Sequence, residues 1–195
     1  MRITVVEMVA MVGSTVWAGA VPANEPQVVV CMASPGDIPM ENLAAAKAVS
    51  SGIFAGIGVN IQWRRPSHCS TQGISITFSN HTPAGLMPGA MAYALPYEGT
   101  HIVVFYDRVK DKPGRWPILL GHVIAHEITH LLQGVARHSE SGVMKATWTG
   151  ADYQQMTLKP LQFTDEDAML IHDSLRVRES SFAAVALAGR APVAP

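Results

Sequence analysis

The chain has 195 residues, a formal net charge of −1 at pH 7, 48% hydrophobic residues and 15% charged residues. This composition excludes a disordered polymer, and a chain of this length is expected to fold as one domain with one core. Because there is no basic excess, neither nucleic acid nor an anionic membrane is expected as a partner.

Residues 1–20 have the features of a secretory signal peptide. Arg2 gives a positive start, the following stretch is nearly all apolar or small, and Ala18-Gly19-Ala20 fits the small-x-small cleavage rule. A second cleavage position follows Ala23. The alternatives are a buried first strand or an uncleaved anchor. No later stretch reaches the roughly 18 apolar residues of a membrane span, so we expect a secreted protein, extracellular or periplasmic, with no stable membrane insertion.

The chain contains two cysteines, Cys31 and Cys69. Outside the cytosol an even pair usually oxidises, so a disulfide is favoured over two free buried thiols. The spacing of the two residues does not resemble a metal motif.

Hydrophobic periodicity predicts an alternation of strands and helices. In chain order these are a strand at 27–32, a helix at 41–57, strands at 59–63, 74–78, 90–95 and 101–106, a helix at 117–133, and a helix that begins at Thr164. Asp167, three residues after Thr164, is expected to be its capping partner at the start of the last helix. Segments 82–89 and 110–115 are expected as loops, and 135–163 has no long periodicity. The first strand-helix-strand unit implies a parallel pair with a right-handed crossover, within a mixed sheet covered by two helices.

The helix predicted at 117–133 carries a motif that could bind a metal ion and take part in catalysis. Pro117 is favoured in the first turn of a helix, and Gly134 is a suitable residue for the helix end. His126 and His130 lie four residues apart and therefore share one face, where two imidazoles can bind one zinc ion. Glu127 stands beside them, and a carboxylate next to such a metal can accept a proton from water. The alternative is a helix with two solvated histidines.

A catalytic zinc site needs a third protein ligand and keeps one position open. His138 is the first candidate, because Gly134 tolerates positive φ and can turn the chain back under the helix. Glu140 is the second candidate. Asp165 or Glu166 on the last helix is the third.

The run from His126 to His138, followed by Ser139 and Gly142-Val143-Met144, resembles the metzincin metallopeptidases, and its His138-Ser139 pair resembles the matrixin branch. The resemblance implies His126, His130 and His138 as zinc ligands, Glu127 as the general base and Met144 in a tight turn below the metal. It implies an α/β (α+β zincin) fold, with a mixed, mostly parallel twisted sheet, an active-site helix and a C-terminal helix.

One spacing departs from the metzincin pattern. That pattern would place the glycine at 133 and the third histidine at 136, where this chain has Gln133 and Ala136. The glycine and the histidine come one and two residues later, at 134 and 138. The helix is therefore expected to run one residue further and the turn to be longer.

The remaining histidines and the aromatic residues after the motif are expected to have mainly structural roles. His122 is expected to be partly exposed near the helix start, with a role in the cleft as the alternative. Trp148 and Tyr153 are expected to pack rather than line the cleft, and His81 and His101 to take no part in the metal site. The strand at 90–95 could be an exposed edge, which can hold an extended peptide through backbone hydrogen bonds.

These observations predict a secreted zinc metalloendopeptidase that cleaves peptide or protein substrates and acts as a monomer. The expected organisation is a signal peptide at 1–20, with cleavage as late as 23, a metzincin-like catalytic domain at 24–178 and a flexible tail at 179–195. The rival hypothesis is a secreted zinc-binding module that has no peptidase activity and acts by binding a partner. The presence of Glu127 speaks against the rival, because metal binding alone does not need that carboxylate.

Overall fold

The computed structural model describes residues 25–188, apart from residues 34, 37, 87–88, 96–98 and 112–115, and for residues 181–188 it describes the backbone only. The predicted signal peptide at 1–20 and the last part of the predicted tail, residues 189–195, lie outside the described residues.

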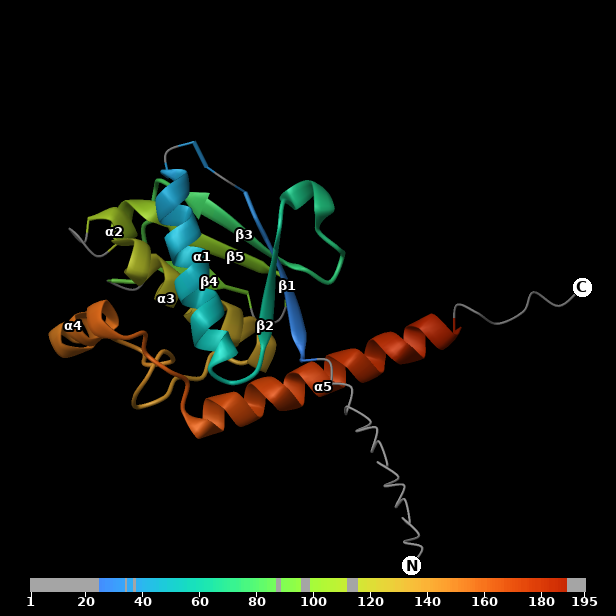
Figure 1. The fold of residues 1–195 in the computed structure, drawn as a ribbon. Helices are drawn as coiled ribbons and strands as arrows, with labels where there is room; N and C mark the ends of the chain where they lie inside the picture. The colour runs from blue at the N-terminus through green and yellow to red at the C-terminus, as the bar shows by residue number, and fades with distance from the viewer. Residues whose placement is uncertain are drawn as a thin grey trace, which may run out of the picture.

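The described residues form a mixed sheet with helices packed against it (Figure 1). The strands are β1 (Gln27–Met32), β2 (Asn60–Arg64), β3 (Ile74–Ser79), β4 (Ala92–Ala94) and β5 (His101–Phe105). The helices are α1 (Met40–Ala55), η1 (Pro66–His68, a 3₁₀ turn), α2 (Tyr106–Lys110), α3 (Trp116–Gln133), α4 (Gly150–Leu158) and α5 (Asp165–Ala188).

The sheet has the order β2-β1-β3-β5-β4. β1 pairs in parallel with β2 and β3, β3 pairs in parallel with β5, and β4 runs antiparallel to β5. The expected parallel pairing of the first two strands and the expected mixed, mostly parallel sheet are therefore confirmed. β4 lies at one edge of the sheet, which agrees with the expectation that the strand at 90–95 could be an edge.

α1 and α3 pack against each other and against the sheet, and their contact needs a residue without a side chain. A Cβ atom at Gly121 of α3 would lie 2.6 Å from Cβ of Val49 and 2.7 Å from the carbonyl oxygen of Ala46, both on α1. The glycine therefore lets the two helix backbones approach closely. The buried apolar residues of the sheet and of both helices form one core, including Val30, Ile53 and Ile124.

α5 crosses the lower part of Figure 1 and contacts the carboxyl end of α3. The Ser174 hydroxyl donates to the carbonyl oxygen of Leu132, and the Arg178 guanidinium donates to that of Leu131 at 2.7 Å. The last carbonyls of a helix have no partner within the helix, and a cation there also interacts favourably with the helix dipole. α5 therefore stabilises the end of the helix that carries the histidine motif.

Cys31 and Cys69 form a disulfide, which confirms the predicted pairing. It joins β1 to the segment that follows η1, across 38 residues of sequence. Gly73 packs beside it, because a Cβ atom there would lie 2.8 Å from the Cys69 sulfur.

The structure differs from the sequence prediction in three segments. Tyr106 ends the predicted strand at 101–106 but begins the short helix α2, and α4 lies inside the segment that had no periodicity. α4 has nine residues, a capping box between Thr149 and Asp152, and Met156 as its buried residue, so it lacks an apolar stripe long enough to be recognised. α5 continues to Ala188, although a flexible tail was expected from residue 179; the alanines of this segment favour helix.

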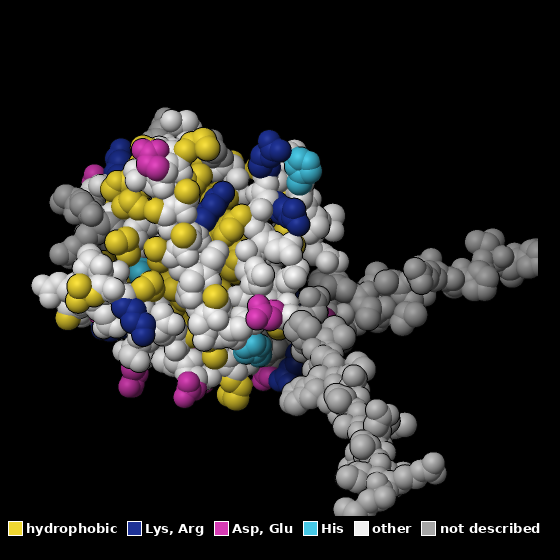
Figure 2. Space-filling view, viewed as in Figure 1, with side chains coloured by type: hydrophobic (Ala, Val, Ile, Leu, Met, Phe, Trp, Pro, Cys, Tyr) yellow, Lys and Arg dark blue, Asp and Glu magenta, His cyan; other side chains and the backbone are white. Residues whose placement is uncertain are grey.

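Among the described helices, none combines the length and the apolar character that a membrane span requires. On the face of the molecule in Figure 2, acidic and basic side chains are scattered among apolar and uncharged ones.

Candidate metal centre

The second half of α3 carries the motif, and every residue from Leu119 to Leu132 is buried. His126, Glu127 and His130 are all at most 9% exposed, and the apolar residues between and around them belong to the core. Gly134 has φ +68° and its N–H donates to the carbonyl oxygen of His130 at 2.9 Å, so it ends the helix as the sequence predicted. The helix thus holds both histidines and the glutamate on a rigid element.

The loop after Gly134 brings His138 to the two helical histidines. One potential ligand atom from each of His126, His130 and His138 lies within 4.8 Å of the others, and these three residues form the one such group among the described residues. The ring centroids are 4.7, 5.2 and 4.9 Å apart for the pairs 126–130, 126–138 and 130–138. Of the other candidates for a third ligand, Glu140 and Asp165 stand outside this group, and Glu166 forms an ion pair with Arg137.

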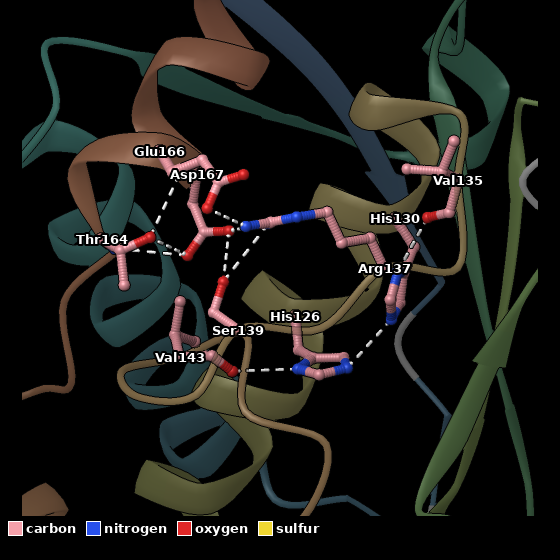
Figure 3. A network of polar contacts seen from close by, with 9 residues as sticks. All are labelled: His126, His130, Val135, Arg137, Ser139, Val143, Thr164, Glu166 and Asp167. Atoms are coloured by element: carbon pink, nitrogen blue, oxygen red, sulfur yellow. Dashed lines mark hydrogen bonds and ion pairs between the residues drawn. The ribbon is translucent and has the colours of Figure 1, made fainter.

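The hydrogen bonds of the two helical histidines fix which ring nitrogen faces the cluster. Nδ1 of His126 lies 2.9 Å from the Val143 carbonyl oxygen, and Nδ1 of His130 lies 3.1 Å from that of Val135 (Figure 3). A carbonyl only accepts, so each Nδ1 carries the proton and each Nε2 presents a lone pair.

The two Nε2 atoms lie 3.0 Å apart, close to the separation that a shared zinc ion would give them. With neither nitrogen protonated, the two lone pairs repel each other unless a cation lies between them. Two nitrogens at 2.0–2.1 Å from one tetrahedral zinc would be about 3.3 Å apart. The three-histidine cluster therefore fits a zinc ion.

The environment keeps the imidazoles neutral, which is the form that binds metal. Burial, followed by repulsion from His130, lowers the pKa of His126 to about 4. Burial is also the main cause that lowers the pKa values of His130 and His138. The cluster consequently needs no deprotonation at neutral pH to accept a cation.

Glu127 is the carboxylate closest in sequence to the cluster, and it is buried at the edge strand. Burial raises the pKa of Glu127 to about 7, although a hydrogen bond from the backbone N–H of Ala94 on β4 lowers it in part. A carboxyl group with a pKa near neutrality can both accept and release a proton at that pH.

A cavity of about 370 Å³ lies over these groups. The three histidines and Glu127 line it, and β4 with the preceding residues from Gly89 forms part of its wall. Trp148 and Tyr153 line the cavity as well, so the expectation that they only pack was wrong. Trp148 does both, because it is 9% exposed and its ring meets the His126 ring edge-on at 5.7 Å.

His122 is fully buried, which contradicts the expectation of a partly exposed residue. Its Nδ1 donates to the Ile118 carbonyl at 2.8 Å, and its Nε2 accepts from the backbone N–H of Leu161 at 3.0 Å. His122 therefore ties α3 to the segment before α5. His101 lies 3.2 Å from the Thr77 hydroxyl, and neither His81 nor His101 is in the histidine cluster, as expected.

Met144 is fully buried in a closed turn that contacts the cluster. The Ser139 N–H donates to the Met144 carbonyl at 2.8 Å, and the Val143 N–H donates to the Gln162 carbonyl at 3.0 Å. The same Val143 presents its own carbonyl to His126. Gly142 has φ +76°, and a Cβ atom there would lie 2.3 Å from the Gln162 carbonyl oxygen, so the turn needs glycine.

A polar network joins the loop of the third histidine to the start of α5 (Figure 3). Arg137 and Ser139 both bind Asp167, which is fully buried, and Arg137 also pairs with Glu166. The predicted cap is confirmed, since the Asp167 N–H donates to the Thr164 hydroxyl at 3.1 Å. The role of Arg137 is not evident from the sequence, where its place directly before His138 is the only signal.

No protein-family model matches the sequence, and no curated protein matches it. Among solved structures, an archaemetzincin from Methanopyrus kandleri is 19% identical with a TM-score of 0.53, over 80% of this chain and 99% of that chain. An archaemetzincin from Archaeoglobus fulgidus, solved with malonate, is 13% identical with a TM-score of 0.48, over 74% of this chain and 99% of that chain. The matrixin-like branch remains a prediction. The chain has the zincin-like α/β fold of the Methanopyrus kandleri archaemetzincin.

Proposed function

We propose that this protein is a secreted zinc-dependent endopeptidase. The observation that carries the proposal is the convergence of His126, His130 and His138 beside the buried carboxyl group of Glu127, in one cavity bordered by an edge strand. The fold shared with an archaemetzincin supports the same activity.

The three histidines would hold the zinc ion. Two of them would bind it through Nε2 from a rigid helix and the third from the following loop, and all three line the cavity. When bound, zinc supplies a Lewis acid that polarises a carbonyl group and makes water more acidic.

Glu127 would move the proton during hydrolysis. Its carboxylate accepts a proton from the attacking water while the water oxygen forms a bond to the peptide carbon. The carboxyl group then donates that proton to the amide nitrogen as the C–N bond breaks, so that a carboxylic acid and an amine leave. A pKa near 7 suits both halves of this transfer.

β4 would hold the substrate. One side of β4 pairs with β5. The other side is the edge of the sheet, where an extended peptide can add as a further strand through backbone hydrogen bonds. Because Ala94 of β4 also donates to Glu127, a peptide bound along this strand would run past the carboxyl group.

Export from the cytosol is supported by two features. The first 20 residues have a signal-peptide pattern, and the Cys31–Cys69 disulfide is typical of oxidising compartments. N-terminal sequencing of protein recovered from the culture medium or periplasm tests this: a start at residue 21 or 24 is expected, and a start at Met1 would contradict it.

The experiment that tests the activity compares Glu127→Gln with Glu140→Gln. Glu127→Gln keeps nearly the same shape but loses the base, so zinc content should be retained and turnover of a peptide library should fall by at least about 100-fold. Glu140→Gln makes the same chemical change outside the histidine cluster and should behave as the wild type. Wild-type protein that binds zinc but cleaves no peptide would favour the binding module instead.

A further inference from the structure

The third histidine of the cluster is held differently from the other two. His126 and His130 stand on α3, and each has a backbone carbonyl against Nδ1. His138 stands on a loop and is exposed; among the described residues its ring contacts the other two rings but has no hydrogen-bond partner of its own. Ligand histidines normally have such a partner, which sets the ring orientation. Something else must therefore hold His138.

Both sequence neighbours of His138 bind one oxygen of one buried carboxylate. Nη1 of Arg137 and Oγ of Ser139 each donate to Oδ1 of Asp167 at 2.7 Å (Figure 3). Nη2 of Arg137 also lies 2.5 Å from Oε2 of Glu166. The backbone of His138 is thus fixed on its two sides by contacts to the start of α5.

The anchor itself is rigid. Asp167 is 0% exposed, and its second oxygen, Oδ2, accepts from the Thr164 hydroxyl at 2.7 Å and from the Thr164 N–H at 3.2 Å. Asp167 lies in the first turn of α5, and its burial and its two bonds to Thr164 hold the carboxylate against that turn. A guanidinium that binds two carboxylates through separate nitrogens is in turn fixed in position and direction.

We propose that Arg137 is a positioning residue for the metal site, because it locks the loop so that the ring of His138 meets the other two histidines. The inference rests on the proposed function only in that the cluster binds zinc. The spacing explains why such a lock is needed: His138 comes two residues later than in the metzincin pattern. A longer loop has more conformations to lose when its end is fixed, and an anchored side chain next to the ligand removes them before metal binding.

The test measures the zinc Kd of the full chain by competition with a chromophoric chelator. Arg137→Ala should raise Kd by about 10–100-fold, the usual effect of losing a residue that orients a ligand. Arg137→Lys should restore part of the affinity, because an ammonium group can pair with a carboxylate but lacks the planar fork. Arg176→Ala is the matched control: Arg176 pairs with Asp173 on the exposed side of α5 and should leave Kd unchanged.

A second control separates positioning from general stability. Ile53→Val removes a buried methyl group from α1 and destabilises the fold without touching the loop. If Ile53→Val raises Kd as much as Arg137→Ala does, or if Arg137→Ala stays within about threefold of wild type, below the usual effect of an orienting residue, the inference is wrong.

The Co²⁺ absorption spectrum gives a readout independent of affinity: a lower d–d intensity in Arg137→Ala alone would support a displaced third ligand. A wild-type chain that binds no zinc would instead overturn the proposed function.

Discussion

Replacing Gly142 by alanine should damage the fold and the metal site together. Gly142 has φ +76°, a left-handed conformation that costs an L-residue about 1–2 kcal/mol. The new Cβ atom would also lie 2.3 Å from the Gln162 carbonyl oxygen, which is backbone and cannot rotate away. Relieving this clash separates the turn from Gln162 and removes the Val143–Gln162 hydrogen bond, which contributes about 0.5–1.5 kcal/mol.

The free energy of unfolding of Gly142→Ala should therefore fall by about 1.5–3.5 kcal/mol. For a domain of this size that corresponds to a decrease in Tm of about 3–14 °C. Because the same turn carries the Val143 carbonyl that faces His126, the zinc Kd should rise as well. Urea unfolding of the metal-free protein and chelator competition measure the two effects separately.

Gly58→Ala is the matched control. Gly58 has φ +70°, but no atom lies within 4 Å of where a Cβ atom would be. Alanine at this position would therefore introduce the backbone strain but no steric clash. The loss should be about 1–2 kcal/mol, with no change in zinc affinity. If the two variants lose the same stability to within about 0.5 kcal/mol, less than one backbone hydrogen bond is worth, the argument from close approach to Gln162 is wrong.

Three further predictions concern the metal ligands, the disulfide and acid stability. His138→Ala should bind zinc far more weakly than wild type, whereas Glu140→Ala should keep its affinity; chelator competition measures both, and the reverse result would make a carboxylate the third ligand. Non-reducing mass spectrometry after alkylation should find Cys31 and Cys69 in one bridge, and two alkylated thiols would contradict this. Although burial opposes it, hydrogen bonds hold the pKa of Asp167 below its usual range, so its contribution to stability is present above about pH 4 and is lost as the pH falls through its folded-state pKa. Asp167→Asn should flatten this acid-side decrease in urea midpoint, and an unchanged pH profile would count against the assignment.

Local sequence patterns were sufficient for the sheet and for the two helical histidines. The alternation in 74–78 reflects which side of a strand faces the core, and the four-residue spacing of His126 and His130 places them on one helical face whatever surrounds the helix. These features depend on neighbours in the sequence, so they can be read from it.

The features that the sequence did not predict depend mostly on contacts between residues far apart in the chain. Asp167 is recognisable as the capping partner of Thr164, three residues away, but its bonds to Arg137 and Ser139 join residues 30 and 28 positions apart. The close approach of Gly142 to Gln162 depends in the same way on where two loops meet. α4 was missed for a different reason, since a short polar helix with one buried methionine has no periodic signal.

The contact between Arg137 and Asp167 also sets the order in which the molecule can mature during biosynthesis. Chains are made from the amino terminus, and Arg137 leaves the ribosome 30 residues before its partner. The helix with the first two histidines can form earlier, but the loop with the third has no anchor until the first turn of α5 has emerged. A nascent chain would therefore hold zinc only weakly, and tight metal capture would coincide with the docking of its last helix.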